Sequence, residues 1–319
     1  MMNWYNFTPQ DTLFFRGAEP ANMGENHTAT MIFPPPAHTI AGALRTAVLA
    51  QKGIDYKKYN AGTLSPEQDS IFAAIGKSGE ESPFDILGPL FFKDNKLWVP
   101  CPYIWFAEKK DKQNIDLRKR TMTVSERLGK NALLKTASSE NLFWAKGNNL
   151  ESLGGGWVCL DELCKPSEEK TILDNGDFFT SEIHTGIALD VKSTRRSVRK
   201  SHLYSFVHAR LRQGIALAIG VTRKLPLTDT GALKLGAEQR FGEYKKLDNV
   251  TFPNGKTGLF MTLSVLPGNE NANSHCIATG RLLYYGGWDL HRGFHKPMKG
   301  YFPAGSVFKE KINDNCIAL

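Results

Sequence analysis

Short apolar segments separated by turn residues run through the first half of the chain. Two of them, Asn3–Phe7 and Thr12–Phe15, are strand candidates. In Ile40–Gln51, apolar residues recur every four positions, which predicts an amphipathic helix. The sequence Ser-Pro-Glu-Gln at 65–68 is a capping box that begins a second helix. Apolar segments flank Asp94-Asn95, and this pattern predicts a hairpin.

The second half of the chain is richer in strand patterns. Its strand candidates are Ile183–Val191, Leu203–Leu211, Ile215–Val221, Gly258–Leu266 and Gly280–Tyr285. In Leu203–Leu211, alternation separates an apolar face from a face that carries Tyr204 and Phe206. Each half thus contains several strands and at least one helix. This arrangement favours an α+β fold of two sandwich-like domains over alternating βαβ units.

A polar, charged stretch at about 108–150 shows little strand periodicity. We interpret it as an insertion, partly helical, in the N-terminal half. The glycines at 154–156 and the charged residues at 168–170 bracket a domain boundary. We therefore expect an N-terminal domain at 1–165 and a C-terminal domain at 166–319.

Composition places the chain among soluble globular proteins, with 41% hydrophobic and 23% charged residues. The formal net charge is +8, and the sequence pI is about 9.1. Such an excess suits a polyanionic partner, because basic side chains that neutralise phosphates release condensed counterions. The alternative is an ordinary protein with a positive surface.

Cysteine usage and the N-terminus predict a cytoplasmic protein. The five cysteines are odd in number and form no Cys-x-x-Cys pair, so we expect reduced thiols rather than a disulfide framework or a zinc site. The first residues lack a charged segment followed by an apolar one, so we expect no signal peptide. No apolar segment approaches the ~20 residues of a membrane span. We expect no membrane contact, no metal and no cofactor.

The entrance to the first predicted helix, with the sequence Pro-Ala-His-Thr-Ile-Ala-Gly-Ala-Leu-Arg, is a candidate phosphate site. Thr39 is the expected N-cap, and the unpaired N–H groups of a helix start attract anions. Gly42 leaves room for a backbone to approach, Arg45 supplies a forked donor, and His38 lies in the same segment. The alternative is an ordinary capped core helix.

A basic segment, Lys192–Lys200, lies between two strand candidates and predicts an exposed loop or hairpin arm. Tyr204 and Phe206 follow it and could stack on bases. The alternative is a solvated run of charges. The residues of the arm that we expect on phosphates are Arg195, Arg196, Arg199 and Lys200.

The C-terminal region combines glycines with cations. Gly286-Gly287 precedes Arg292 and Lys296, and Gly305-Ser306 follows. Glycine lets backbone N–H groups approach an anion, whereas the alternative is a hairpin that needs glycine only for its turns. The pattern matches neither a Walker A loop nor a dinucleotide fingerprint.

Catalytic signatures are few. The sequence contains no His-x-Glu, His-Glu-x-x-His or Gly-x-Ser-x-Gly motif. His184, His202 and His208 share one region and could form an acid–base set for RNA cleavage. Structural or RNA-contacting roles are favoured for all three, so we expect no catalytic residue.

Eight segments, taken together and in order, resemble the third subunit of the type III-B CRISPR (Cmr) complex, a RAMP protein similar to the Cas five group. They are Asp11–Gly17, Phe33–Pro36, Thr39–Arg45, Gly88–Phe91, Leu97–Pro100, His184–Asp190, Leu203–Ser205 and Pro303–Val307. The chain departs from the family at 235–240, where Ala237 stands in place of a glycine.

The resemblance implies an α+β fold of two ferredoxin-like (RRM-like) RAMP domains that face a shared cleft. It also implies a non-catalytic subunit that binds the 5′ tag of the guide RNA (crRNA). The implied partners are the large Cas ten subunit and the adjacent backbone RAMP subunit. Arg16, Gly305 and Ser306, which lie in the matching segments, join the RNA-binding candidates, as does Arg240 of the departing segment at 235–240. Two alternatives stay open, a RAMP endoribonuclease that uses His184 or His208 and a scaffold that binds only protein.

Overall fold

The structure is a computed structural model of the whole chain. It describes residues 2–16, 28–29, 31–65, 68–109, 118–128, 142–189, 198–248, 250–286, 288–289 and 293–319. The predicted RNA contacts Arg195 and Arg196, and also Arg292, lie outside the described residues.

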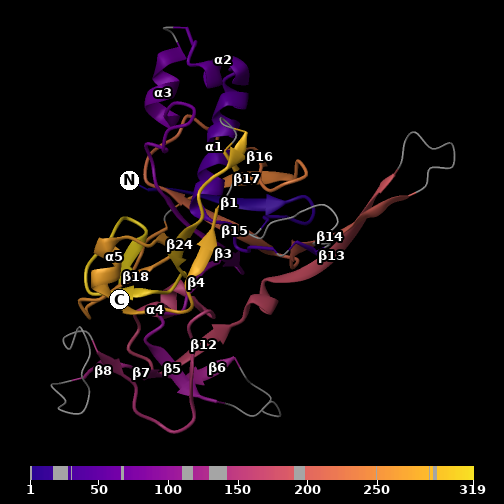
Figure 1. Cartoon of the computed structure of the whole chain (residues 1–319). Coiled ribbons are helices and arrows are strands. Elements are labelled where there is room, and N and C mark those ends of the chain that lie inside the picture. Colours follow the sequence, from indigo (N-terminus) through magenta and orange to yellow (C-terminus); the bar gives the residue numbers. More distant parts are fainter. Residues whose placement is uncertain are drawn as a thin grey trace.

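A nine-stranded sheet forms the centre of the molecule (Figure 1). The pairs along this sheet are antiparallel. In spatial order its strands are β16 (Thr230–Lys234), β17 (Phe241–Leu247), β1 (Asn3–Pro9), β15 (Ile215–Val221), β3 (Ile86–Lys93), β4 (Lys96–Pro100), β11 (Trp157–Cys159), β12 (Glu169–Leu173) and β6 (Lys119–Thr121).

The sheet takes strands from both halves of the sequence. β1 pairs with β15 on one side and with β17 on the other, and β15 continues to β3. The boundary expected at 165–166 therefore does not coincide with a division of the sheet. The α+β class is confirmed, since strands dominate and helices are few. The arrangement as two ferredoxin-like domains around a cleft stays a prediction.

Both faces of the sheet are covered, which explains why its central strands are apolar throughout. All seven residues of β15 are buried. In β3, Phe91 belongs to the core cluster that also contains Ile40 and Leu44, whereas its neighbour Leu90 belongs to the cluster with Met261. Successive side chains of a strand point to opposite faces, so each strand supplies both cores.

Three helices gather at one end of the molecule, seen at the top of Figure 1. They are α1 (Ala37–Gln51), α2 (Tyr56–Ala61) and α3 (Asp69–Ile75). The prediction of Thr39 as N-cap is wrong: Pro36, held in an extended conformation at φ −66° and ψ 150°, precedes the helix. The second predicted helix is confirmed as α3, and Gly76 follows it as expected.

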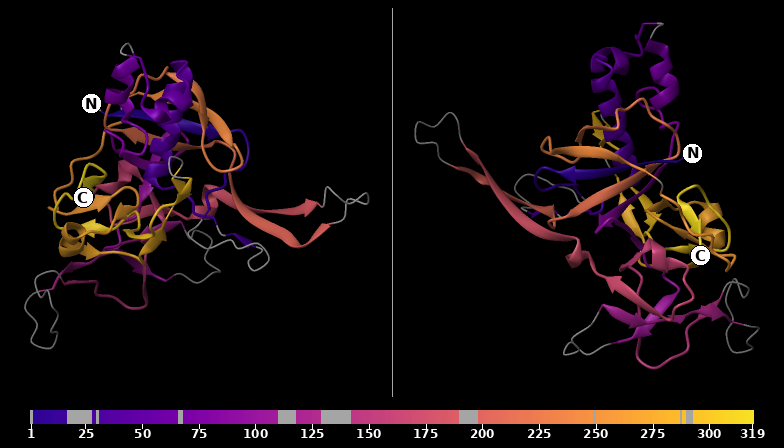
Figure 2. Two further views of the ribbon diagram at one scale, coloured as in Figure 1. Left: turned by 45° about the horizontal axis from the view of Figure 1, so that its top comes forward. Right: turned by 180° about the vertical axis from the view of Figure 1, so that it is seen from behind.

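The strands β13 (Phe179–Leu189) and β14 (Val198–Leu211) form a long antiparallel hairpin, hereafter the hairpin. It projects away from the body of the molecule in the views of Figures 1 and 2. The short strand β2 (Thr28–Ala29) pairs in parallel with β14 near the base. The prediction of a hairpin arm is thus confirmed for the strands.

The rest of the chain forms short elements. They are β5 (Trp105–Glu108), β7 (Thr123–Val124), β8 (Glu126–Arg127), β9 (Phe143–Trp144), β10 (Leu150–Ser152), α4 (Leu160–Leu163), the 3-10 helix η3 (Asn175–Asp177), β18 (Phe260–Thr262), β19 (Leu266–Pro267), α5 (Glu270–His275), β20 (Cys276–Ala278), β21 (Leu283–Tyr285), β22 (Trp288–Asp289), β23 (Phe294–His295), β24 (Lys299–Phe302), β25 (Val307–Phe308) and β26 (Cys316–Ala318).

One local prediction needs correction, and another stays a prediction. The described parts of 108–150 contain short strands and no helix, but 110–117 and 129–141 lie outside the described residues, so the partly helical insertion stays a prediction. Thr12–Phe15 is no regular strand, because only Leu13 forms a bridge, to Ala209 of β14. The turn at Asp94-Asn95 is confirmed, with φ of 52° and 59°, the left-handed values that a tight hairpin turn requires.

Candidate nucleic-acid interface at the base of the hairpin

Five rings lie in sequence at the base of the hairpin, and we call them the ring stack. His184 and His208 are parallel, with centroids 4.0 Å apart. Phe14 stacks on the other side of His208 at 5.1 Å, and Phe206 stacks on Phe14 at 4.9 Å. Tyr204 follows at 5.0 Å and is 40% exposed. The ring stack therefore passes through the buried His208 and Phe14 and ends in a partly exposed ring on each side, His184 and Tyr204.

Strand register explains how the hairpin contributes four of these rings. His184 of β13 pairs with Phe206 of β14, and Gly186 pairs with Tyr204. Residues two apart on a strand share a face, so these side chains line the face that Phe14 contacts. A Cβ atom at Gly186 would lie 2.3 Å from the ring of Tyr204. The absence of a side chain there lets the tyrosine lie across the partner strand.

A chain of ion pairs surrounds the ring stack. Arg210 binds both carboxylate oxygens of Glu182 and also Asp11, with Nη2 3.0 Å from Asp11 Oδ1. Asp11 also accepts a hydrogen bond from Arg240 at 2.6 Å. Arg240 in turn lies 3.2 Å from Glu238. One carboxylate, Asp11, thus joins the hairpin to the loop between β16 and β17.

The two histidines connect the two ends of this series of ion pairs, Glu182 and Glu238. His184 Nε2 lies 3.3 Å from Glu182 Oε2, and His208 Nε2 lies 3.8 Å from Glu238 Oε2. Because the two imidazoles stack on each other, the ion pairs and the ring stack form one closed network. We call it the hairpin lock.

Shifted pKa values follow the geometry of the hairpin lock. The backbone N–H of Thr12 and the guanidinium groups of Arg210 and Arg240 lower the pKa of Asp11. The hydrogen bond that Arg210 donates, and then the one that His184 donates, lower the pKa of Glu182. These shifts keep the carboxylates ionised, so the ion pairs persist at mildly acidic pH.

His208 is the buried centre of the lock. It is wholly inaccessible, and its Nδ1 lies 3.0 Å from the hydroxyl of Thr12, which is also wholly buried. Burial, and then the positive charge of His184, lowers the pKa of His208. Its Nε2 finds no hydrogen-bond partner among the described residues. The neutral imidazole is therefore the favoured form.

The loop at 235–240 positions the two charged residues that it contributes. Gly236 adopts φ +105°, and the N–H of Ala237 donates to the carbonyl of Phe14 at 2.9 Å. Glu238 and Gln239 take the left-handed values of 57° and 56°. Ala237 is not among the residues with positive φ, so the alanine departure leaves the turn intact.

The entrance of α1 lies near the C-terminal region. Crowding by neighbouring atoms and the positive charge of Lys296 lower the pKa of His38 to about 4, although the residue keeps an exposed surface. No side chain caps the first turn of α1 among the described residues, and that turn contains no acid. Gly42 is exposed, and a Cβ atom there would meet nothing within 4 Å. This entrance is open to an anion.

Arg45 has a structural position instead. Its guanidinium donates to the carbonyls of Glu80 and Lys77 and to the hydroxyl of Tyr59, the last at 2.6 Å. These bonds tie α1 to α2 and to the loop after α3. The geometry gives Arg45 a packing role and directs its donors away from the entrance of α1.

Gly305 and Ser306 are also interior. Ser306 is wholly buried, and its hydroxyl bonds to the carbonyl of Pro303 at 2.7 Å and to Thr279 at 2.9 Å. Gly305 has φ +91°, and a Cβ atom there would lie 2.4 Å from the carbonyl oxygen of Cys101. Both residues are buried and the glycine serves packing, so their expected direct contact with RNA stays a prediction.

The remaining candidates lie along the hairpin and beside its base. Arg16 is exposed and forms a backbone bridge with Met31. Arg199 and Lys200 belong to β14. Arg240 is committed to Asp11 and Glu238, so it holds the lock. The structure thus brings the hairpin, the 11–16 segment and the 235–240 loop together, whereas Arg45 and the 305–306 turn lie apart from them.

A family model for CRISPR-associated protein (Cas_Cmr3) matches residues 5–256. The chain belongs to the Cas_Cmr3 family. The resemblance to the third subunit of the type III-B complex is thereby confirmed, and the chain is a RAMP subunit of a type III-B CRISPR effector complex. No curated protein matches the chain.

Solved structures support the fold of this Cas_Cmr3 protein. One is a chain of the type III-B Cmr-beta complex bound to cognate target RNA, with 15% identity and a TM-score of 0.55; the match covers 97% of this chain and 86% of that one. Another is a chain of the same complex with cognate target RNA and AMPPnP, with 14% identity, a TM-score of 0.53 and coverage of 96% and 85%. At such identities the likeness concerns the fold alone.

The histidine-based alternative finds little support in the geometry of this Cas_Cmr3 protein. His208 is wholly buried and cannot reach an RNA phosphate in this conformation. The side chain of His184 is 38% exposed but bonds to Glu182. In the described part of the chain, no group of three or more His, Cys, Asp or Glu side chains is arranged to hold a metal ion. None of the described helices is long and apolar enough to cross a membrane.

Sequence reasoning missed most of the hairpin lock. Asp11 and Phe14 were considered only as part of the segment Asp11–Gly17 that resembles the family. Glu182 was not named as a candidate. The alternation in β14 was a usable signal, because it places His208 and Arg210 on the face with Tyr204. Nothing local indicated that Asp11, about two hundred residues earlier, would bind that face.

Proposed function

We propose that this subunit binds the 5′ tag of the guide RNA without cleaving it, with the hairpin as its principal grip. The observation that carries the proposal is the projecting hairpin, whose connecting residues 190–197 include Lys192, Arg195 and Arg196 in sequence. A basic arm of this kind can follow a phosphate backbone. The related Cmr-beta structures are described as bound to cognate target RNA, which supports an RNA-binding role.

The ring stack supports a contact with bases. Tyr204 is the exposed end of a continuous stack, so a base placed on its face would extend an existing series of rings. The hairpin lock fixes the direction in which the hairpin leaves the body. A grip that is fixed before binding loses less conformational entropy when RNA arrives.

The RNA contacts that we retain lie on the hairpin, beside its base and at the entrance of α1. They are Arg16, His38, Thr39, Gly42, Arg195, Arg196, Arg199, Lys200 and Tyr204. Arg240 is retained as a residue that positions the 235–240 loop. Arg45, Gly305 and Ser306 are left out because their polar groups bind the protein itself.

The outer face of the hairpin suits the adjacent backbone RAMP subunit. Ile183 is 71% exposed, Ile187 48% and Leu189 44%, and all three lie on the face opposite the ring stack. Several large apolar side chains exposed along one strand favour a protein contact at this face. We further propose that the large Cas ten subunit contacts the protein elsewhere, which leaves the hairpin to the RNA and the backbone subunit.

RNA binding by the isolated chain tests the proposal. Fluorescence anisotropy with a labelled tag oligonucleotide is measured over a salt series for the wild type and for Arg195→Ala/Arg196→Ala. On single strands, each phosphate contact contributes about 0.7 to the slope of log K against log salt. Loss of two contacts should therefore make this slope shallower by about 1.4. Lys57→Ala/Lys58→Ala, on exposed positions of α2, removes the same charge and should leave the slope unchanged.

Three results would overturn the proposal. An unchanged slope in the arm variant would remove the hairpin from the interface. Negligible RNA affinity of the wild type, combined with assembly of the complex in the absence of RNA, would favour the scaffold that binds only protein. Cleavage of precursor RNA by the purified chain, lost in His184→Ala, would favour the endoribonuclease.

A further inference from the structure

A preformed groove lies at the helical end of the molecule. Its volume is about 580 Å³, within the ~300–1,000 Å³ typical of ligand sites. It lies between the end of α1, one side of α3 and the segment that follows β15. The lining residues are Lys52, Ile54, Gln68, Ser70, Ile71, Ala74, Lys224, Leu225 and Pro226.

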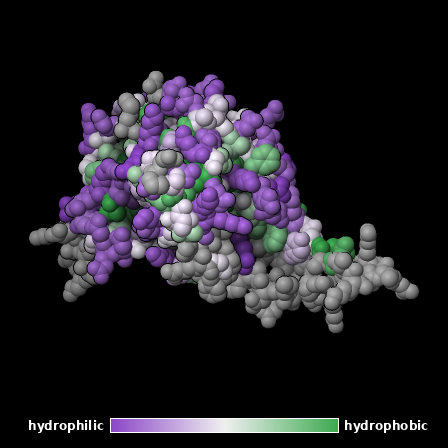
Figure 3. All heavy atoms as spheres, turned by 90° about the horizontal axis from the view of Figure 1, so that it is seen from above, coloured by the Kyte–Doolittle hydropathy of each residue, from purple (hydrophilic) through white to green (hydrophobic). Residues whose placement is uncertain are grey.

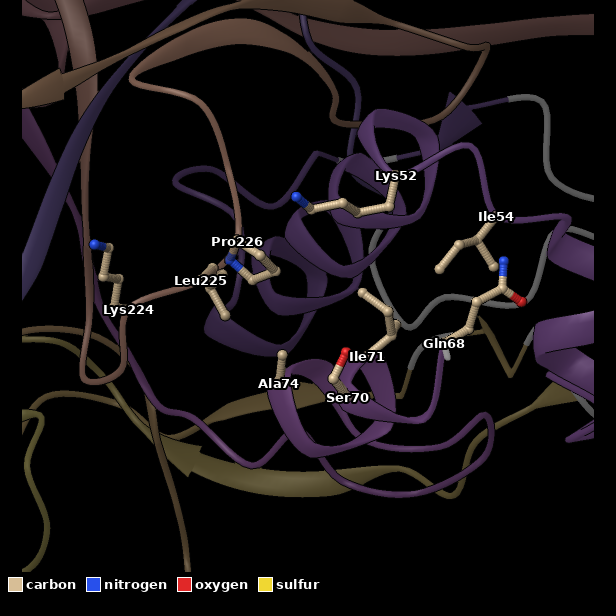
Figure 4. Close-up of a pocket in the computed structure, with 9 residues that line it drawn as sticks. All are labelled: Lys52, Ile54, Gln68, Ser70, Ile71, Ala74, Lys224, Leu225 and Pro226. Carbon is tan, nitrogen blue, oxygen red and sulfur yellow. The ribbon is translucent and has the colours of Figure 1, made fainter. Parts of the chain in front are cut away.

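Figure 4 shows how these side chains surround the groove. Lys52 extends over one side of it, and the Ser70 hydroxyl lies on the opposite side, on α3. Leu225 and Pro226 form one wall, Lys224 stands beyond them, and the remaining apolar lining comes from Ile54, Ile71 and Ala74. The face seen from the helical end in Figure 3 is mostly hydrophilic, with small hydrophobic areas between the polar side chains.

Hydrogen bonds hold the walls of the groove in place. Arg223 donates to the carbonyl of Ala73 at 2.8 Å, which fixes the start of the 224–228 segment against α3. At its other end, the N–H of Thr228 donates to Gln51 at 3.0 Å. Gln51 also donates to the hydroxyl of Tyr244 at 2.6 Å. The groove therefore exists before any partner arrives, which reduces the entropy lost on binding.

The lining has a definite chemistry. Its floor is aliphatic, with Ile71 and Leu225 almost fully buried, and its rim carries two lysines. Among the described residues that line it, none is acidic and none is aromatic. An RNA strand would find no ring to stack on and no arginine fork, so the groove suits aliphatic side chains flanked by carboxylates better than bases.

We propose that this groove is the docking site for a segment of another subunit of the effector complex, one that inserts aliphatic side chains and places acidic residues beside Lys52 and Lys224. The charges are complementary, because Lys52 and Lys224 form no ion pair with any described residue, and such a pair of lysines favours an acidic partner. A subunit must bury part of its surface against its neighbours, and the groove offers a shaped apolar floor for that purpose. The inference requires only membership of the complex and is independent of the proposed RNA grip.

Competitive assembly measures the contribution of the groove. Wild type and variant, labelled with different fluorophores and mixed in equal amounts, are assembled with the remaining purified subunits and guide RNA. Ala74→Glu places a carboxylate in the groove and should deplete the variant from the complex about tenfold, the effect of ~1.4 kcal/mol. Ala73→Glu makes the same change at the adjacent, exposed position of α3 and should assemble like the wild type.

A second pair of variants covers the case in which Ala74→Glu destabilises the fold. Lys52→Glu changes an exposed side chain on the rim and should also be depleted, whereas Lys57→Glu on α2 should not. Incorporation of both groove variants within twofold of the wild type would overturn the proposal. Guide-RNA anisotropy on the same isolated variants should equal that of the wild type, which separates failure of the groove from failure of the RNA grip.

Photo-crosslinking identifies the occupant. Benzoylphenylalanine in place of the exposed Ser70 is activated in the assembled complex, and the linked peptide is sequenced. A segment of another subunit that contains both acidic and aliphatic residues is the expected product. Crosslinks to RNA, to a second copy of this chain or to nothing would each contradict the docking of such a segment.

Discussion

Two clusters of stacked rings in this protein differ in how far they are buried. In the core, Phe91 stacks on Phe178 with centroids 4.3 Å apart and meets Trp157 edge-on at 4.6 Å, and all three rings are buried. The ring stack at the base of the hairpin instead has the buried His208 inside it and partly exposed rings, His184 and Tyr204, at its two ends.

The difference lies in what surrounds the rings. The core cluster is enclosed by other apolar side chains, so its geometry is set by close packing. The ring stack contains two imidazoles and is bordered by the ion pairs of the hairpin lock. Packing fixes a core from all sides, whereas a surface stack needs directional polar contacts to hold one orientation. Four measurements test this difference.

The largest effect is expected in the core. Phe91→Ala removes a wholly buried ring from the centre of the cluster and should lower the free energy of unfolding by about 3–5 kcal/mol. Phe241→Ala, at a position that is 53% exposed, should change it by less than about 1 kcal/mol. Urea denaturation followed by circular dichroism gives both values. Equal losses would show that the two positions do not differ in packing.

The centre of the hairpin lock should show a smaller and more specific effect. His208→Phe keeps a ring in the stack but leaves the buried hydroxyl of Thr12 without its partner, at a cost of about 1–3 kcal/mol. Adding Thr12→Val removes the unpaired hydroxyl and should recover part of this loss. A double variant whose loss equals the sum of the two single losses would rule out coupling between the residues.

Lowering the pH should reduce the free energy of unfolding, because His208 is buried in the folded state. Because burial lowers its pKa in the folded state, the unfolded chain binds a proton near pH 6.5 that the native chain does not. The free energy of unfolding should therefore be highest above this pH and should fall as the pH decreases toward the lowered pKa. His38, with a pKa of about 4, acts in the same direction. Denaturation between pH 7.5 and 4.5 should show a shallower loss in His208→Gln, and an identical pH profile would contradict the assignment.

The smallest effect on stability is expected at the exposed end of the ring stack. Tyr204→Leu should change the free energy of unfolding by about 0.5 kcal/mol or less. If a base stacks there, the same change should weaken tag binding by about 1–3 kcal/mol. Tyr204→Phe keeps the aromatic ring and should therefore bind the tag with the affinity of the wild type. Anisotropy and denaturation on the same samples separate the two effects. Normal affinity of Tyr204→Leu would exclude the base contact.

Local elements were largely predictable from the sequence. The apolar segment at Ile215–Val221 became a buried strand, and Asp94-Asn95 formed the expected turn. Errors arose where a local signal competed with a longer-range contact. Thr12–Phe15 has strand-like residues, but its partners are a hairpin and a loop, so it forms a bridge instead of a ladder. Arg45 looked available for phosphate because its acceptors, at residues 59, 77 and 80, are invisible in a local pattern.

The family, the strand-rich α+β class and the place of the basic arm in the chain could be predicted from residue order and from periods of two or four residues. The position of β1 between strands near residues 220 and 240, and the binding of Asp11 to both Arg210 and Arg240, became visible only in the folded molecule. Such contacts join residues far apart in the chain. Their selection depends on how both faces of the central sheet are covered, which no short segment specifies.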